Sequence, residues 1–212
     1  MSSHETIEVI LFDLDNTLYP PQAGLIEAGD RLIAGFIADR LDLALEEADR
    51  LRVRLWLQYG ATARGLQVEH GIPQREYFAG SIERVPIEEY IRPDPDLAAL
   101  LRSLPHRRCV FTNSTERYAH RVLRGLGVDE LFEGVYHIEF TGGCPKPEAE
   151  SYRAVLDEIG VPPQRVALVD DTEANLGPAA DLGMLTLKLH DPPEDPRHRY
   201  LEDLHDLPEL LG

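Results

Sequence analysis

A short apolar stretch near the N-terminus is the first clear pattern in this chain. Val9–Phe12 form a near-continuous apolar run, which is typical of a strand buried on both faces of a parallel sheet. At its carboxyl end the sequence changes abruptly to the polar residues Asp13, Asp15, Asn16 and Thr17. Open α/β folds place their ligands outside the carboxyl ends of their strands, so these residues are candidates for a functional site.

The region after this strand has the pattern of helices. Apolar residues recur at three- and four-residue spacing over residues 25–41 and again over residues 45–59, which predicts two amphipathic helices. Shorter helices are predicted around residues 64–69 and over residues 74–82. Because no strand pattern interrupts the region, we expect residues 20–90 to form an all-helical insertion over the carboxyl edge of the sheet.

Strand and helix patterns alternate through the rest of the chain. Strands are predicted at residues 108–112, 135–138, 165–169 and 184–189, and helices at residues 96–103, 116–126, 147–159 and 173–182. Strands that alternate with helices form a parallel sheet with right-handed crossovers. We therefore expect an α/β fold, with a Rossmann-like parallel sheet flanked by helices, made by residues 1–19 and 91–212.

The last segment of the chain has a different composition. From His190 onward it is rich in Pro and Asp, and we expect it to run over the surface. His198 and His205 are accordingly expected to face solvent and not to bind a metal.

Composition and charge narrow the class of partner. The chain has 212 residues, of which 43% are hydrophobic and 28% are charged, as in ordinary soluble globular proteins. Its formal net charge of −17 would repel both nucleic-acid polymers and anionic membrane surfaces. A small phosphorylated ligand would have to be attracted by a local group of cations.

The cysteines and the N-terminus indicate the compartment. Cys109 and Cys144 are the only cysteines, and they lack the C-x-x-C spacing of redox or metal sites. Residues 1–6 are polar, and the first apolar run is too short for a signal peptide or a membrane span. We expect reduced cysteines and a cytoplasmic protein.

Two later segments add hydroxyl groups and a cation. Thr112 and Asn113 stand at the end of the predicted strand at residues 108–112, and Ser114 is expected to cap the following helix. Lys146 lies between two prolines at a predicted helix start, where the helix dipole disfavours a positive charge. A functional role for this lysine is therefore favoured.

A second pair of carboxylates follows another buried strand. The apolar run 166–169 ends in Asp170 and Asp171, which join Asp13 and Asp15 at the same edge of the predicted sheet. Four carboxylates with one lysine make an oxygen-rich site that suits Mg²⁺ better than zinc or copper. A lysine and a hydroxyl that hold phosphoryl oxygens would complete a site for phosphoryl transfer.

This ordered set resembles the motifs of the haloacid dehalogenase (HAD) superfamily. The residues that carry the resemblance are Asp13-Leu14-Asp15-Asn16-Thr17, Thr112, Lys146-Pro147 and Asp170-Asp171. The helical insertion is similar to the type 1 cap of that superfamily. Three further segments resemble its pyrimidine 5′-nucleotidase-like branch, namely residues 13–20, residues 59–66 with Glu69-His70-Gly71, and Arg92-Pro93-Asp94. The resemblance covers residues 9–189.

The resemblance implies roles for the four carboxylates. Asp13 would be the nucleophile that forms an aspartyl-phosphate, and Asp15 would act first as general acid and then as general base. Mg²⁺ would be held by Asp13, the backbone carbonyl of Asp15, and Asp171, with Asp170 as a ligand or as a neighbour of the ligands. Asn175 has two open interpretations, a role in the site or a place on the helix surface or at its cap.

The resemblance also implies residues that bind substrate. Thr112 and the backbone around Asn113 would hold phosphoryl oxygens, and Lys146 would offset the charge of Asp13 and of the phosphoryl group. Apart from the resemblance, residues of the helical insertion that could contact a base or sugar are Tyr59 and Arg64, together with Trp56, Thr62, Gln67 and Tyr77. Packing between the insertion and the sheet, or exposure to solvent, is the open alternative for each of them.

The predicted function is Mg²⁺-dependent hydrolysis of a small phosphate monoester by a monomer or homodimer, with a pyrimidine nucleoside 5′-monophosphate as the expected substrate. A sugar-phosphate or phosphoglycolate-type phosphatase or mutase would share the same core motifs. A 2-haloacid dehalogenase is disfavoured by Asp15 and by the Asp170-Asp171 pair. A non-catalytic binding protein with this fold is disfavoured because Asp13 and Asp15 are both present.

Overall fold

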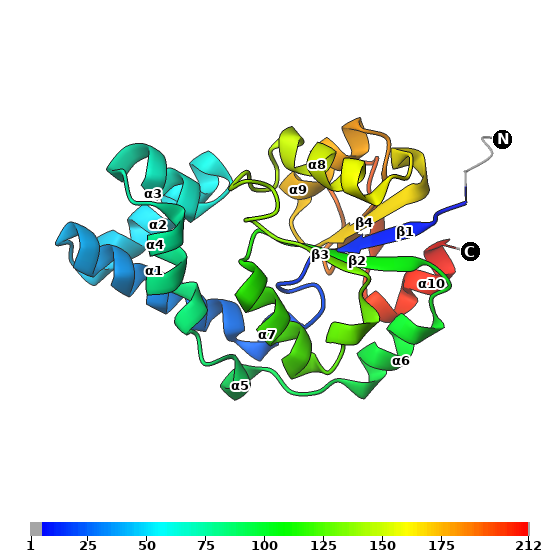
Figure 1. Ribbon diagram of the computed structural model, residues 1–212, viewed down its shortest axis with the longest axis horizontal. Coiled ribbons are helices and arrows are strands. Elements are labelled where there is room, and N and C mark those ends of the chain that lie inside the picture. Colours follow the sequence, from blue (N-terminus) through cyan, green and yellow to red (C-terminus); the bar gives the residue numbers. More distant parts are fainter. Residues whose placement is uncertain (1–5, 212) are drawn as a thin grey trace.

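The apolar run near the N-terminus lies at the centre of a six-stranded sheet. A computed structural model describes residues 6–211, and all the neighbouring strands of its sheet run parallel in the order β3-β2-β1-β4-β5-β6 (Figure 1). The strands are β1 (Val9–Phe12), β2 (Arg107–Phe111), β3 (Gly134–Tyr136), β4 (Val166–Asp170), β5 (Leu185–Leu189) and β6 (Arg199–Leu201). The predicted α/β fold is confirmed.

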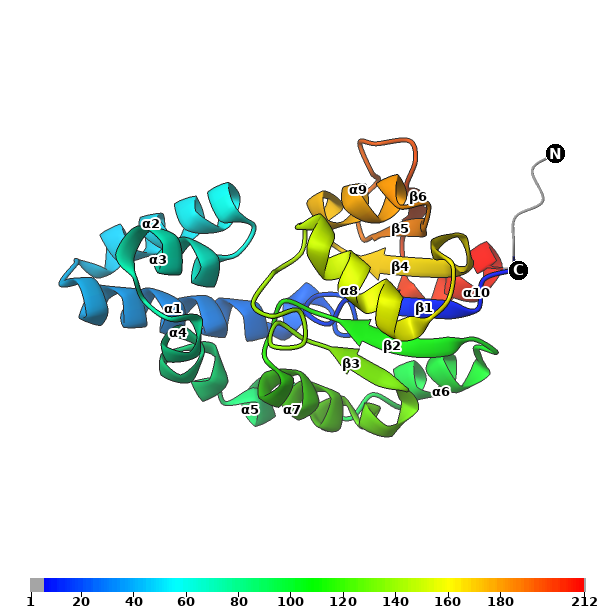
Figure 2. The ribbon, with the colours of Figure 1, turned by 45° about the horizontal axis from the view of Figure 1, so that its top comes forward.

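Helices cover both faces of this sheet. One face carries α6 (Pro95–Ser103), α7 (Glu116–Leu126) and the C-terminal α10 (Leu207–Leu211), and the other carries α8 (Ala149–Ile159) and α9 (Glu173–Asp181) (Figures 1 and 2). Side chains alternate along a strand, so Ile10 and Phe12 pack on the first face whereas Val9 and Leu11 pack on the second. All four are buried, which explains why β1 is apolar throughout.

The predicted insertion is helical. It contains α1 (Leu25–Leu41), α2 (Leu45–Tyr59), α3 (Thr62–His70), α4 (Gln74–Gly80) and α5 (Ile87–Tyr90), with short 3₁₀ turns at Pro21–Ala23 and Ile82–Arg84. Helices α1 to α4 lie beyond the carboxyl ends of the strands (Figure 2) and have an apolar core of their own, in which Ile37, Leu55 and Leu66 are fully buried. These five helices with their turns are called the helical insertion below.

One helix begins later than its pattern predicted. We expected a helix from residue 147, but α8 begins at Ala149 with Glu148 at its N-cap. The reason is a turn, closed by the bond from the backbone N–H of Glu148 to the carbonyl of Pro145. Lys146 therefore precedes the helix, and the argument from the helix dipole does not apply to it.

The expectation that the chain runs over the surface after His190 was wrong. The Pro- and Asp-rich composition marks only a loop, after which the chain adds β6 to the sheet edge and then α10. Leu201, Leu204 and Leu207 recur at three-residue spacing and are buried. His198 is also buried, with Nδ1 at 2.8 Å from the Thr186 hydroxyl, whereas His205 is exposed as expected.

The structure also bears on the cysteines and on membrane spans. Cys109 and Cys144 are free thiols. Burial raises the pKa of Cys109 to about 11, so this thiol stays protonated and unreactive at neutral pH. Within residues 6–211, the helices are all too short or too polar to cross a lipid bilayer.

Docking of the C-terminal helix should contribute measurably to stability. Leu207 is fully buried, so Leu207→Ala should lower the free energy of unfolding by about 2–4 kcal/mol through lost burial and the cavity that remains. Glu209→Ala changes an exposed residue of the same helix. This variant should change the free energy of unfolding by less than about 0.5 kcal/mol. Urea unfolding of both variants measures the difference. Equal, small effects would contradict the packing of α10 on the sheet.

Candidate active site

Lys146 lies at the centre of the candidate site and joins carboxylates from two neighbouring strands. Its Nζ donates hydrogen bonds to Asp13 Oδ1 at 2.7 Å and to Asp170 Oδ2 at 2.6 Å. Asp13 follows β1 and Asp170 ends β4, and the two strands are paired with Phe12 opposite Val169. Lys146 and Asp170 have exposures of 1% and 0%. The sheet register thus produces two buried ion pairs that share one ammonium group.

Two residues of the neighbouring strand and its loop hold this lysine in place. The Asn113 side chain donates from Nδ2 to the Lys146 carbonyl at 2.9 Å and accepts from the Lys146 backbone N–H at 2.7 Å. The Lys146 ammonium lies 5.1 Å from the centroid of the Phe111 ring, a favourable cation–π distance. The side-chain amide of Asn113 is therefore engaged by the backbone of Lys146. The backbone around Asn113, which was predicted to hold phosphoryl oxygens, takes no part in these two bonds.

A second aspartate stands beside this ion pair. Asp13, Asp170 and Asp171 can each direct one carboxylate oxygen so that the three lie within 4.8 Å of one another. Asp170 accepts from Asn175 Nδ2 at 3.0 Å with both oxygens and from the Thr172 backbone N–H at 2.9 Å. Asn175 thus hydrogen-bonds a carboxylate of the site. Of the two open interpretations, these contacts support a role in the site.

This oxygen cluster fits a hard divalent cation. Three carboxylates and one ammonium group leave two negative charges without compensation. Carboxylate oxygens are ligands that Mg²⁺ prefers. Because Asp170 already accepts bonds from Lys146, Asn175 and Thr172, the oxygens of Asp13 and Asp171 are the ones more available to an ion.

The electrostatics of the cluster show that one ammonium group does not offset the burial and mutual repulsion of its carboxylates. Burial raises the pKa of Asp13 well above its usual value, and Lys146 lowers it while Asp170, Asp171 and Asp15 raise it further. Burial, followed by the charge of Asp170, raises the pKa of Asp171 to about 6. Burial alone would lower the pKa of Lys146, but Asp13 and Asp170 outweigh it and raise that pKa, so the ammonium stays charged.

Asp15 has entirely different surroundings from Asp13. Its Oδ1 accepts hydrogen bonds from the Tyr19 hydroxyl at 2.5 Å and the Tyr118 hydroxyl at 3.0 Å, and its Oδ2 accepts from the Ser114 hydroxyl at 3.0 Å. Burial raises the pKa of Asp15, and the three hydroxyl donors oppose this. Ser114 was expected to cap α7, but Thr115 has that position. None of these three donors was predicted from the sequence.

The predicted hydroxyl of Thr112 follows directly after β2. Thr112 is buried, and its Oγ1 accepts the backbone N–H of Ser114 at 3.0 Å. Thr17 Oγ1 donates to Asp13 Oδ2 over 3.5 Å, which is a long contact. Asp13 Oδ2 is therefore less engaged than Oδ1.

The C-terminal segment reaches this site as well. The ring Nε2 of His190 donates to the Asn16 carbonyl at 2.7 Å, and the Tyr200 hydroxyl donates to the His190 carbonyl at 3.0 Å. Asn16 has a left-handed backbone with φ of 59°, a conformation that Asn tolerates better than most residues. The segment around β6 thus braces the turn between Asp15 and Thr17.

The two candidates in the helical insertion are partnered within the protein. Arg64 Nη2 is 3.5 Å from Glu148 Oε1 at the N-cap of α8. Tyr59 donates from its hydroxyl to Glu69 Oε1 at 3.0 Å. Among the described residues, neither side chain hydrogen-bonds to the carboxylate cluster. Arg64 thus joins the insertion to the sheet-containing part, and Tyr59 contacts other residues of the insertion.

The insertion also contacts the loop that carries Lys146. Gln74 Nε2 donates to the Gly143 carbonyl at 3.1 Å. Gly60 has a left-handed φ of 73°, and a Cβ there would lie 2.7 Å from Pro147 Cδ. Glycine is required by both the backbone and this close approach. The insertion therefore packs directly against the lysine-bearing loop.

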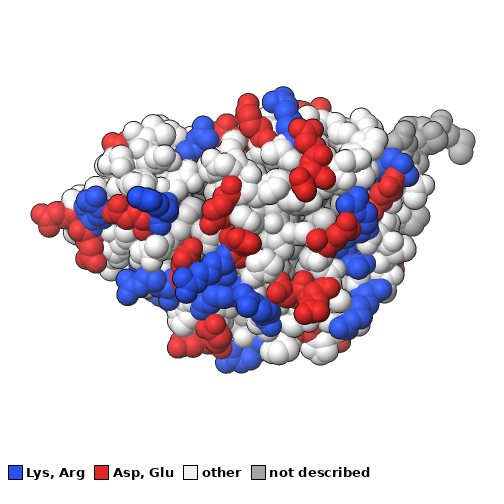
Figure 3. Space-filling model, viewed as in Figure 1, with Lys and Arg blue, Asp and Glu red and all other residues white. Residues whose placement is uncertain are grey.

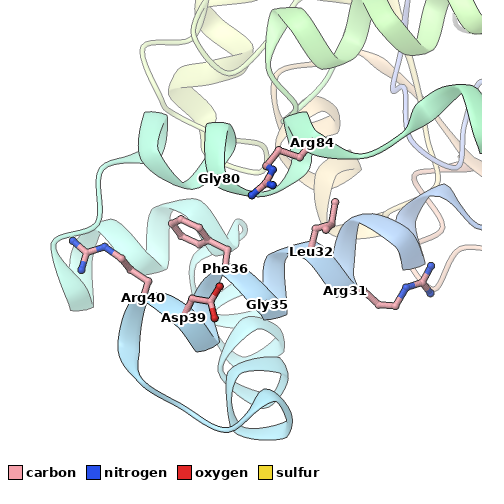
Figure 4. Close-up of a pocket in the computed structure, with 8 residues that line it drawn as sticks. All are labelled: Arg31, Leu32, Gly35, Phe36, Asp39, Arg40, Gly80 and Arg84. Atoms are coloured by element: carbon pink, nitrogen blue, oxygen red, sulfur yellow. The ribbon is translucent and has the colours of Figure 1, made fainter.

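Two surface cavities lie outside the carboxylate cluster. One of about 340 Å³ is on the insertion, lined by Arg31, Leu32, Gly35, Phe36, Asp39, Arg40, Gly80 and Arg84 (Figure 4). The second, of about 310 Å³, lies between α4 and the loop after β3, and its lining includes Gln74, Phe78, Thr115, Ile138 and Gly143. On the face seen in Figure 3, acidic and basic side chains are interspersed.

A parallel sheet with this lysine–carboxylate cluster at its carboxyl edge defines a class of α/β hydrolases. Residues 7–183 match the haloacid dehalogenase-like hydrolase family, and the chain belongs to that family. The superfamily resemblance inferred from the four motifs is thereby confirmed. The match does not extend to the pyrimidine 5′-nucleotidase-like branch.

Individual relatives agree with this assignment. The chain is 26% identical to Phosphate metabolism protein 8 of Saccharomyces cerevisiae over 84% of its own length, and it spans 60% of that protein. It is 27% identical to Enolase-phosphatase E1 of Nocardia farcinica, over 81% of this chain and 74% of the relative. The magnesium-bound HAD-hydrolase YfnB of Bacillus subtilis has the same fold, with a TM-score of 0.67 at 17% identity, covering 98% of this chain and 100% of YfnB.

The raised pKa of Asp171 predicts how stability depends on pH without metal. A carboxyl with a pKa of about 6 when folded, and of about 4 when unfolded, binds its proton more tightly in the folded state. Its contribution therefore favours folding as the pH falls from about 7 to about 4, by at most about 3 kcal/mol. Asp171→Asn should remove this contribution.

Chemical unfolding in EDTA at pH 7.5 and pH 5 measures the effect. The change in unfolding free energy between the two pH values should be smaller in Asp171→Asn than in wild type. Asp157→Asn, at an exposed aspartate of α8, is the control and should behave as wild type. Identical pH dependence in all three proteins would contradict the raised pKa.

Proposed function

We propose that this protein is a Mg²⁺-dependent phosphatase that hydrolyses small phosphate monoesters through an aspartyl-phosphate on Asp13. The observation that carries the proposal is the buried ammonium of Lys146, which bonds both Asp13 and Asp170 beside Asp171. A fixed cation next to a carboxylate nucleophile is suited to a dianionic phosphoryl group. The relatives named as phosphatases support the same chemistry.

Asp13 has one oxygen available for attack. Lys146 holds Oδ1, whereas Oδ2 has only the long contact with Thr17. In this mechanism Oδ2 forms a bond to phosphorus as the ester P–O bond breaks, with Lys146 and the hydroxyl of Thr112 next to the phosphoryl oxygens. This covalent step divides one hard displacement into two easier ones.

Asp15 transfers one proton in each of the two steps. In the first step the protonated carboxyl of Asp15 gives its proton to the leaving oxygen, which departs as an alcohol. In the second step Asp15 takes a proton from water as the water oxygen attacks phosphorus, which releases phosphate and restores Asp13. The different surroundings of the two aspartates agree with their different roles.

The metal belongs to the same proposal. Asp13 and Asp171, with Asp170 beside them, would hold Mg²⁺, with the backbone carbonyl of Asp15 as the further ligand that the resemblance implies. When bound, the ion would offset the two uncompensated negative charges and the charge of the phosphoryl group.

We further infer that the substrate is a nucleoside 5′-monophosphate, with pyrimidine bases preferred. The resemblance of residues 13–20 and 59–66 to the pyrimidine 5′-nucleotidase-like branch supports this. The cavity of about 310 Å³ supports it as well, because it has the size of small-ligand sites. Thr115, which lines it, follows Ser114, whose hydroxyl bonds Asp15. In this proposal residues 20–90 form a cap over a core made by residues 1–19 and 91–212.

Replacing the nucleophile should abolish turnover. Asp13→Asn should lower phosphate release from p-nitrophenyl phosphate by at least about 10³-fold, since no other nucleophile replaces the carboxylate. Circular dichroism should report an unchanged fold. Wild-type activity should require Mg²⁺ and be lost in EDTA. A variant that retains a few per cent of the wild-type rate would contradict the covalent mechanism.

A substrate screen tests the nucleotide assignment. Uridine and cytidine monophosphates should exceed ribose 5-phosphate in kcat/KM by about 10-fold or more, because contacts to the base can hold the cap closed. Arg64→Ala and Tyr59→Ala should reduce this ratio. Arg153→Ala changes an exposed arginine of α8 that pairs with Glu150 and is the control.

The same screen contains the competing substrates. Phosphoglycolate and glucose 6-phosphate represent the other phosphatases with these motifs, and release of halide from 2-chloropropionate represents dehalogenases. A phosphoglycolate or hexose phosphate preference would make the nucleotide assignment wrong and leave the phosphatase proposal intact. Halide release without phosphate release would overturn both.

A further inference from the structure

The carboxylate of Asp15 is held by hydroxyl groups in an asymmetric way. Oδ1 accepts two hydrogen bonds, from Tyr19 at 2.5 Å and from Tyr118 at 3.0 Å, whereas Oδ2 accepts one, from Ser114 at 3.0 Å. A carboxylate oxygen has two lone-pair positions for hydrogen bonds. Oδ1 is therefore fully occupied, and Oδ2 has one position left.

Both tyrosines are firm donors. Tyr118 is fully buried and Tyr19 is 4% exposed. Burial, with the charge of Asp15 next, raises the pKa of each phenol, so both hydroxyls keep their protons at neutral pH. Asp15 is their hydrogen-bond acceptor among the described residues. A buried hydroxyl without a partner is unfavourable, so the two tyrosines and Asp15 fix one another.

The two donors come from separate parts of the fold. Tyr19 lies four residues after Asp15 in the loop that follows β1. Tyr118 lies in the first turn of α7, where its backbone N–H bonds the Thr115 hydroxyl at the N-cap. The rings of Tyr19 and Tyr118 belong to the same buried apolar cluster as Leu14. Side chains locked by packing in this way can hold a reacting group in a defined orientation.

We propose that Tyr19 and Tyr118 are positioning residues, which clamp Asp15 by Oδ1 so that Oδ2 is the oxygen that exchanges protons with the leaving group and with water. The inference rests on the proposed role of Asp15 as general acid and base. Proton transfer then takes place at one oxygen of Asp15, and the two tyrosine hydroxyls determine which oxygen that is. Without the clamp the carboxyl group would rotate, and a small misplacement of a catalytic group is costly.

Comparing two esters with different leaving groups distinguishes a positioning role from a purely structural one. An alkoxide such as that of ribose 5-phosphate must be protonated as it departs, whereas p-nitrophenolate leaves without a proton. The value of kcat/KM reports only the first transfer, before water attacks, so it isolates the acid role. Tyr19→Phe and Tyr118→Phe each remove one hydroxyl and leave the ring in place.

Each variant should lower kcat/KM for ribose 5-phosphate by about 10-fold to 10²-fold, and for p-nitrophenyl phosphate by less than about 3-fold. The double variant should widen the gap between the two esters. Tyr136→Phe, at another buried tyrosine of the sheet, should leave the ratio of the two esters as in wild type. Thermal unfolding, followed on each variant, confirms that the assays were done on folded protein.

Asp15→Asn separates this inference from the function on which it rests. Loss of acid–base catalysis typically lowers the rate by about 10²-fold to 10⁴-fold. Asp15→Asn should therefore lower kcat/KM mainly for ribose 5-phosphate. If Asp15→Asn discriminates between the esters and the tyrosine variants do not, the positioning role is wrong and the proposed function stands. If Asp15→Asn lowers both esters equally, the acid role of Asp15 is wrong and the positioning role falls with it.

Discussion

The buried ion pairs of Lys146 are the interaction on which the rest of the site depends. Burying an ammonium and two carboxylates carries a large desolvation cost, which is offset only when the geometry is good and the remaining polar atoms are bonded. The structure meets this condition through the backbone clamp of Asn113 and the amide of Asn175 on Asp170. It also requires β1 and β4 to be neighbours, because that register brings Asp13 and Asp170 to one ammonium.

The cluster remains unbalanced even with these bonds. The pKa values of Asp13 and Asp171 are raised because burial and mutual repulsion exceed what Lys146 supplies. A fold would be more stable without such a cluster, so its presence indicates a site where stability is given up for binding. Asp170, by contrast, accepts hydrogen bonds from Lys146, Asn175 and the Thr172 backbone N–H, so its oxygens are the most fully bonded of the three.

The parts of this structure that the sequence predicted are those encoded locally. The apolar run of β1 and the carboxylates after it are adjacent in the chain, so strand, edge and chemistry could be inferred together. The donors to Asp15 could not, because Tyr118 lies 103 residues away and its partner depends on how α7 rotates against the sheet. The burial of Leu201 and Leu207 was missed for a related reason, since the Pro- and Asp-rich loop before them obscured their spacing. Lys146 was identified through an argument about a helix start, but its position is set by the two carboxylates.

The fold solves a problem that two aspartates so close in sequence would otherwise have. Asp13 and Asp15 leave the same strand, and in equal surroundings they would titrate alike and repel each other. The turn after β1 sends Asp13 to the ammonium from the loop before α8 and Asp15 to the hydroxyls of Tyr19, Ser114 and Tyr118. Lys146 is the group that most opposes the burial that raises the pKa of Asp13, whereas hydrogen bonds from Tyr19, Ser114 and Tyr118 most oppose the burial that raises the pKa of Asp15. The two-residue spacing is therefore useful because the loop before α8 supplies the partner of Asp13, while the segments after β1 and β2 supply the partners of Asp15.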